Sequence, residues 1–193
     1  MRRYILTAVV LAITGGLTAA AQTPSPVGTS GDMVTAGAVM RDAKGTEVGQ
    51  VRLEETPHGI LMILELKNAA PGVHGLHIHE VGRCDAPTFE SAGDHFSPDR
   101  RVHGFRSAGG PHAGDLPNIH VPASTELGVE LLIPDLALSP GPRGLLGGDG
   151  SAIVIHSGPD DHRSDPAGET GDRIACGVVA QNTGANPNIP EVR

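Results

Sequence analysis

The segment Gly75-Leu76-His77-Ile78-His79-Glu80 alternates apolar and imidazole side chains with a period of two residues. On a β-strand, residues i and i+2 point to the same face, so the two histidines are expected to project together. Leu76 and Ile78 then face the opposite side, towards a core. Imidazole is a common ligand of zinc and copper, which makes the two histidines a candidate pair of metal ligands. The same pattern, taken alone, also fits a solvated polar face.

Further strand-like segments flank this stretch on both sides. Residues 60–66 form a nearly continuous apolar run, as a buried strand would. Residues 47–55 alternate imperfectly, and a β-bulge at Gly49 would explain the irregularity. No segment shows a convincing helical pattern. The predicted strands are residues 33–40, 47–55, 60–66, 73–80, 127–133, 151–156 and 173–180.

Two long polar segments interrupt the series of strands. Residues 80–121 show no periodicity and are rich in Gly, Pro, Asp and His, and residues 159–172 form a second polar loop. Loops of such length inside a compact domain are usually functional. The chain has 27 Gly and 16 Pro, which favours a turn-rich β protein. We therefore expect an all-β fold, a Greek-key β-sandwich or barrel of immunoglobulin-like type, with two long functional loops.

The N-terminus has the features of a secretory signal peptide. Arg2 and Arg3 precede an apolar run, and Ala19-Ala20-Ala21 matches a cleavage site. A membrane anchor is the alternative, but the apolar run is short for a span of roughly 20 residues. The expected organisation is a signal peptide (1–21), a flexible leader (22–32), one domain (33–180) and a C-terminal tail (181–193). This predicts a periplasmic or secreted protein with no membrane attachment after cleavage.

The chain is acidic, with a formal net charge of −8 at pH 7. Removal of residues 1–21 takes away two arginines and leaves twelve basic and twenty-two acidic side chains, a charge of −10. No basic cluster offsets this charge, which argues against nucleic acid as a partner.

The only cysteines are Cys84 and Cys176. In an exported protein a single pair far apart in sequence predicts one disulfide bond. The bond would close a loop of 92 residues (176 − 84), which the chain-entropy relation values at roughly 4–5 kcal/mol. Two buried free thiols are the alternative.

A second group of candidate ligands lies in the first long loop, namely His95, His103, His112 and Asp115. Three imidazoles and one carboxylate are enough for a closed tetrahedral zinc site, and a bound metal would order the loop. The alternative is a disordered loop that happens to carry histidines. His156 ends a predicted strand and adds a ligand to the His77 and His79 pair only if the fold brings those strands together.

These motifs resemble those of the copper/zinc superoxide dismutases, and most closely those of the bacterial exported branch. The resemblance covers roughly residues 33–180, with the motifs in family order. The matching strings are Gly75-Leu76-His77-Ile78-His79-Glu80, Ser91-Ala92-Gly93-Asp94-His95-Phe96-Ser97-Pro98, Gly110-Pro111-His112-Ala113-Gly114-Asp115, Ser151-Ala152-Ile153-Val154-Ile155-His156 and Arg173-Ile174-Ala175-Cys176-Gly177.

The resemblance implies a role for each matching residue. It makes Arg173 the catalytic residue that receives the anion, and it makes His95 a catalytic residue and a ligand shared by both metals. Asp160 would orient one copper-binding and one zinc-binding histidine, and Cys84 and Cys176 would form the family disulfide. The implied ligands are His77, His79, His95 and His156 for copper, and His95, His103, His112 and Asp115 for zinc.

The implied reaction is the disproportionation of superoxide to oxygen and hydrogen peroxide, by cycling between Cu(II) and Cu(I) beside a structural zinc. The oligomeric state stays open between monomer and homodimer. Glu90, Asp94 and Gly158 stand where relatives often have lysine or glycine, so we expect weak electrostatic steering of the anion. A non-catalytic copper- and zinc-binding protein and a metal-free adhesive sandwich are the competing interpretations.

Overall fold

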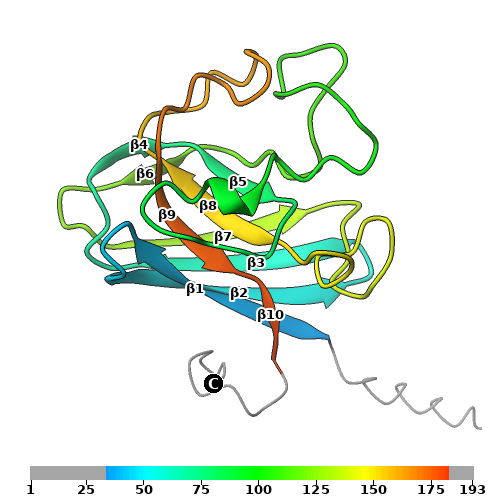
Figure 1. Ribbon diagram of the computed structural model, residues 1–193, viewed down its shortest axis with the longest axis horizontal. Helices are drawn as coiled ribbons and strands as arrows, with labels where there is room; N and C mark the ends of the chain where they lie inside the picture. The colour runs from blue at the N-terminus through cyan, green and yellow to red at the C-terminus, as the bar shows by residue number, and fades with distance from the viewer. Residues whose placement is uncertain (1–33, 183–193) are drawn as a thin grey trace, which may run out of the picture. The chain divides into compact units, whose positions relative to one another are not determined.

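A computed structural model describes residues 34–182, which lie in one compact unit, Asp32–Arg193 (Figure 1). The predicted signal peptide, the leader and the tail beyond residue 182 lie outside the described residues. Within the described part there are ten strands and no α-helix. The elements are β1 (Thr35–Asp42), β2 (Glu47–Thr56), β3 (Gly59–Leu66), β4 (Gly72–His74), β5 (Leu76–His79), the 3₁₀ turn η1 (Glu90–Ala92), β6 (Ile119–Val121), β7 (Leu127–Ile133), β8 (Ala152–His156), β9 (Arg173–Val178) and β10 (Ala180–Gln181).

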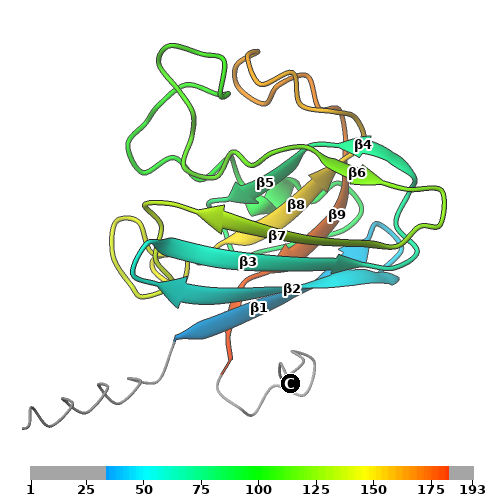
Figure 2. The same ribbon diagram turned by 180° about the vertical axis from the view of Figure 1, so that it is seen from behind.

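The main sheet is antiparallel throughout and has the strand order β5-β8-β9-β1-β2-β3-β7. Strand β1 pairs with β10 at its start and with β9 at its end, while β4 and β6 form a separate two-stranded sheet. The main sheet curls, as Figures 1 and 2 show from opposite sides. The predicted all-β, Greek-key class is confirmed, because neighbours such as β3 and β7 are far apart in sequence.

Aliphatic side chains on one face of the strands fill the core. Leu53, Ile60, Met62 and Leu64 are fully buried, while alternate residues of β2 and β3 are more exposed. Burial of such a side chain contributes roughly 1.5–3 kcal/mol, and the pattern follows from the two-residue period of a strand.

The bulge expected at Gly49 is present. Pairing passes from Met40 opposite Gly49 to Arg41 opposite Glu47, so Val48 has no direct partner. Val48 and Gly49 are consequently both buried in spite of being neighbours. A Cβ atom on Gly49 would lie 2.3 Å from the carbonyl oxygen of Glu65, so only glycine fits there.

The single strand predicted over residues 73–80 is wrong, because the structure divides it at Gly75 into β4 and β5. The Gly75 amide donates to the Gly158 carbonyl, and its carbonyl accepts from the His156 amide. A Cβ atom at this position would lie 2.7 Å from Thr170 Cγ2. These partners are distant in sequence, so the local pattern gave no sign of the break.

Two other predicted boundaries also change. Residues 173–180 divide into β9 and β10, with Val179 between them. Strand β6 was missed inside the first long loop, because three residues are too few to show alternation. The remaining predicted strands are present with ends shifted by at most two residues.

The two long loops lie side by side at one end of the main sheet, the first in green and the second in orange (Figures 1 and 2). They carry most of the polar residues singled out from the sequence. Among residues 34–182, none belongs to a helix with the length and apolar character needed to span a membrane.

Candidate metal centre

Strands β5 and β8 bring His156 beside the histidine pair of β5. Leu76 pairs with Ile155, the neighbour of His156, while Leu76 and Ile78 point into the core. The ring centroid of His156 lies 4.9 Å from that of His77 and 5.8 Å from that of His79. The convergence that the sequence left open is therefore present.

The first long loop docks along the free edge of β5. The Phe96 amide donates to the Ile78 carbonyl at 2.8 Å, and the Ile78 amide donates to the Gly114 carbonyl at 2.9 Å. A Cβ atom on Gly114 would lie 2.3 Å from the Ile78 oxygen, so this approach requires glycine. As a result His95 lies opposite His79, and Asp115 lies opposite His77.

Four imidazoles converge at the first group of ligand atoms. One nitrogen from each lies within 4.8 Å of the others, and all four residues are buried. None of the four nitrogens has a hydrogen-bond partner among the described residues; they are His77 Nδ1, His79 Nε2, His95 Nε2 and His156 Nε2. An unsatisfied buried polar atom costs about 1–3 kcal/mol, so four together need an explanation. A copper ion fits, because imidazole nitrogen is a ligand that it favours.

In three of these histidines, the other ring nitrogen lies within hydrogen-bond distance of an oxygen atom. His79 Nδ1 donates to the Gly93 carbonyl at 2.9 Å, and His77 Nε2 donates to Asp160 Oδ2 at 2.8 Å. His156 Nδ1 lies 3.0 Å from Thr170 Oγ1, whose own hydrogen goes to the Ala167 carbonyl. These contacts place the ring hydrogen on the nitrogen that faces away from the centre of the group, here called the outer nitrogen. The converging nitrogen of each ring, the inner nitrogen, keeps its lone pair free for a metal.

The second group is built around the carboxylate of Asp115. Its Oδ1 lies 2.9 Å from His95 Nδ1, 3.1 Å from His103 Nδ1 and 3.3 Å from His112 Nδ1. Its Oδ2 accepts the backbone amides of Gly104 and His112. Zinc bonds of about 2.0–2.1 Å in a tetrahedron place ligand atoms roughly 3.3 Å apart, so the donor set fits zinc.

Asp160 connects the two groups. Its carboxylate accepts from His77 Nε2 at 2.8 Å and from His103 Nε2 at 2.9 Å. Gly168, with φ +70°, covers this carboxylate so closely that a Cβ atom would lie 1.9 Å from Asp160 Oδ1. One buried carboxylate therefore orients an imidazole in each ligand group.

The two groups differ in the charge of their histidines when no metal is bound. Burial lowers the pKa of His79 to about 2, of His156 to about 3 and of His77 to about 4, although the hydrogen bond to Asp160 partly opposes the shift at His77. Burial would also lower the pKa of His103, but hydrogen bonds to Asp115 and Asp160 outweigh it and raise that pKa to about 9.

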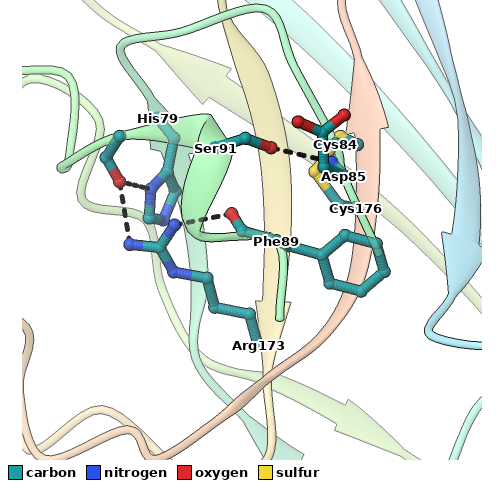
Figure 3. The surroundings of a disulfide bond; sticks show 8 residues. His79, Cys84, Asp85, Phe89, Ser91, Arg173 and Cys176 are labelled. Carbon is teal, nitrogen blue, oxygen red and sulfur yellow. Dashed lines mark hydrogen bonds between the residues drawn. A yellow bond between two sulfur atoms is a disulfide. The ribbon is translucent and has the colours of Figure 1, made fainter. Parts of the chain in front are cut away.

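The segment that follows Cys84, which carries Phe89 and Gly93, holds Arg173 beside the first group (Figure 3). Cys84 and Cys176 are bonded, with Cα atoms 5.7 Å apart, which confirms the predicted disulfide. The Arg173 guanidinium donates to the Phe89 carbonyl at 2.7 Å and to the Gly93 carbonyl at 2.8 Å. The Gly93 carbonyl also accepts from His79, so one oxygen fixes both the arginine and an inner imidazole.

A cavity of about 490 Å³ opens onto these residues. His95, His156 and Arg173 line it, together with Arg100 and Arg101. The acidic residues Glu80, Asp94 and Asp165 line the same cavity. Charges of both signs therefore surround the entrance.

Some residues of the site were not singled out from the sequence. Thr170 holds the His156 ring, and the carbonyl groups of Phe89 and Gly93 hold Arg173. Asn118 holds Asp160 by its backbone. No local pattern in the sequence marks the orienting role of any of these groups.

A curled antiparallel sheet and a long loop docked on it bring six histidines and an aspartate into two adjoining ligand groups, an arrangement typical of β-barrel proteins with a two-metal centre. A profile of the copper/zinc superoxide dismutase family matches residues 47–179. The chain belongs to this family. The family's reaction is the disproportionation of superoxide, and its cofactors are copper and zinc.

Relatives and solved structures agree with this membership. The chain is 47% identical to "Superoxide dismutase [Cu-Zn] 1" of Aquifex aeolicus over 138 residues, which are 70% of this chain and 82% of the relative. It is 43% identical to a Cu-Zn superoxide dismutase of Caulobacter vibrioides over 148 residues, 75% of this chain and 85% of the relative. The crystal structure of a double mutant of a SOD-like protein from Bacillus subtilis superposes with a TM-score of 0.72 at 39% identity, covering 74% of this chain and 95% of that one.

Proposed function

We propose that His77, His79, His95 and His156 hold the copper of this superoxide dismutase, and that His95, His103, His112 and Asp115 hold its zinc. The main support is the convergence of four buried nitrogens with no hydrogen-bond partner. His95 contributes Nε2 to that group and Nδ1 to the Asp115 group, so one ring serves both metals.

Copper, when bound, supplies the chemistry of accepting an electron from one superoxide and returning it to a second. Arg173 binds the anion in this proposal. Two of its N–H groups are used on the carbonyls of Phe89 and Gly93, which leaves donors of the fixed guanidinium fork for a ligand in the cavity. Whenever it is not bound to copper, His95 Nε2 is the ring atom that would hold a proton for the product peroxide, because it has no protein partner and its residue lines the same cavity.

The zinc group has a positioning role. Zinc has no redox chemistry, so its ligands act by fixing His95 and the first long loop. Asp115 does this from two sides, since one oxygen faces the imidazoles and the other accepts two backbone amides.

We also propose that the protein is exported, to the periplasm or the medium. The disulfide between Cys84 and Cys176 supports export, because such bonds persist in oxidising compartments. Fractionation of the native host, followed by mass determination of the mature N-terminus, tests the proposal. Retention of residues 1–21 in cytoplasmic protein would contradict it.

The experiment for the proposed ligands compares protein loaded with copper and zinc against protein loaded with zinc alone. Competition for superoxide between the protein and cytochrome c measures activity, and metal analysis measures occupancy. We expect about one copper and one zinc per chain, with activity only in the copper-containing sample. Stoichiometric copper without activity would instead favour a metal-buffering protein.

A further inference from the structure

His162 lies in the second long loop and contacts the first long loop through its backbone. Its backbone amide donates to Asp160 Oδ1 at 2.6 Å, and its carbonyl accepts the amide of Arg106 at 2.8 Å. Its φ of +59° is left-handed, a conformation in which His and Asn are enriched among residues other than glycine. His162 thus contacts both the Asp160 carboxylate and the first long loop.

The ring of His162 packs between Phe105 and Asp160. Its centroid lies 5.1 Å from that of Phe105. Its Nδ1 lies 3.4 Å from Asp160 Oδ2, near enough for electrostatic attraction, yet it is buried and makes no hydrogen bond. It is the only such nitrogen among the described residues outside the two ligand groups.

Asn118 determines which ring nitrogen of His162 carries the hydrogen. Its Oδ1 accepts the Asp160 amide at 2.8 Å, and its Nδ2 donates to the Asp160 carbonyl at 2.8 Å, so the orientation of the amide is fixed. The second Nδ2 hydrogen faces His162 Nε2 at 3.3 Å. Nε2 therefore accepts, and Nδ1 carries the ring hydrogen, on the side of the ring that lies 3.4 Å from Asp160 Oδ2.

We propose that His162 is a positioning residue for the metal centre. The electrostatic attraction between its Nδ1–H and Asp160 Oδ2 keeps the carboxylate turned towards His77 and His103, and so controls how tightly zinc is retained. Asp160 Oδ2 lies 2.8 Å from His77 Nε2 and 3.4 Å from His162 Nδ1, and Oδ1 of the same carboxylate lies 2.9 Å from His103 Nε2. Because the carboxylate is rigid, a change at His162 that turns it also moves the oxygen that orients the proposed zinc ligand His103. The proposal rests on the zinc ligands proposed above.

A purely structural role is the competing explanation, because His162 also packs on Phe105 and bonds Arg106. Two substitutions separate the explanations. His162→Asn keeps an N–H donor at the position of Nδ1 and tolerates positive φ, whereas His162→Asp has the same size and backbone preference but places a carboxylate against Asp160. Both lose the ring contact with Phe105 equally, so a difference between them reports on Asp160.

The experiment measures the rate of zinc transfer from the full protein to a chromogenic chelator, and the visible spectrum of cobalt placed in the zinc site. We expect His162→Asn to stay near the wild type. We expect His162→Asp to release zinc about tenfold faster, the lower end of the range for groups that orient metal ligands, with an altered cobalt spectrum. The same pair of substitutions at His120, an exposed residue of β6, is the control and leaves both readouts unchanged.

Equal zinc release by the two variants, or slower release by His162→Asp, would overturn the proposal. Formation of the disulfide in both variants shows that each has folded. If the wild-type protein itself takes up no zinc, the assignment of the zinc ligands fails instead, and that outcome is read from the unmodified protein alone.

Discussion

The two ligand groups are built in different ways. Three of the four histidines proposed to bind copper lie on β5 and β8, and every residue of these two strands is buried. The residues proposed to bind zinc all lie in the first long loop, which docks on the sheet by backbone hydrogen bonds along the edge of β5. We therefore infer that the proposed copper site is built mainly by the sheet, whereas the proposed zinc site depends on a loop that a bound metal would help to order.

The two groups also differ in the protonation of their histidines when no metal is bound. Around copper, burial keeps His77, His79 and His156 neutral in the metal-free protein. Around zinc, His103 gains a proton between the carboxylates of Asp115 and Asp160. We infer that the loop without zinc is held in part by an imidazolium between two carboxylates, whereas the copper pocket holds only unsatisfied lone pairs.

The largest effect is expected from loss of a copper ligand on the sheet. His156→Ala removes one of four converging nitrogens without touching the first long loop. Activity in the cytochrome c assay should fall more than about 100-fold, beyond the loss typical of groups that only orient ligands. Zinc content should stay near one per chain. Retained activity would show that His156 is not a copper ligand.

Loss of a zinc ligand should act on the loop first. In His112→Ala the affinity for zinc should fall by at least roughly 10–100-fold. Amide hydrogen exchange should speed up across residues 95–115, while the amides of β8 remain protected. Unchanged exchange in the loop would mean that its docking on β5 does not depend on zinc.

Arg173 differs from the proposed copper and zinc ligands because it binds no metal in this account. Arg173→Ala should lower activity by roughly tenfold and leave the copper and zinc content unchanged.

The wild-type rate should depend only weakly on ionic strength, because Glu80, Asp94 and Asp165 share the cavity with the arginines. A steep loss of wild-type activity with added salt would contradict the expectation of weak steering.

At neutral pH the smallest effect is expected in the pH dependence of the stability of the metal-free protein. Above pH 6.5 the three copper-facing histidines are neutral in both the folded and the unfolded chain, so they add no pH dependence. Below pH 6.5 the unfolded chain binds protons that the folded protein resists, since burial lowers these pKa values to about 4, 2 and 3. Each of the three histidines should lower the free energy of unfolding by roughly 1 kcal/mol per pH unit between pH 6.5 and 4.5, so together they lower it by about 3 kcal/mol per pH unit. Denaturant titrations that give a constant value there would argue against neutral buried imidazoles.

Much of the fold was predictable from local pattern. Alternation on residues 47–55 and the continuous apolar run 60–66 correspond to β2 and β3. The break at Gly75 was not predictable, because its causes are Gly158 and Thr170, more than eighty residues away. Strand β6 was not predictable either, since a three-residue strand has no measurable period.

The residues of the site likewise fall into a set that the sequence predicted and a set that it did not. Side chains that bind metals stand out by residue type, so His77, His79 and His156 were candidates before their positions were known. The groups that orient them do not stand out, since the Gly93 carbonyl, the Thr170 hydroxyl and the Asn118 amide are ordinary polar groups. Their roles depend on long-range contacts that no local pattern encodes.

Anomalous diffraction from crystals of the copper- and zinc-loaded protein, recorded at both absorption edges, tests the ligand assignment most directly. We expect a copper peak among the inner nitrogens of His77, His79, His95 and His156, and a zinc peak among His95, His103, His112 and Asp115. A copper peak remote from His156, or a zinc peak remote from Asp115, would contradict the two-group account.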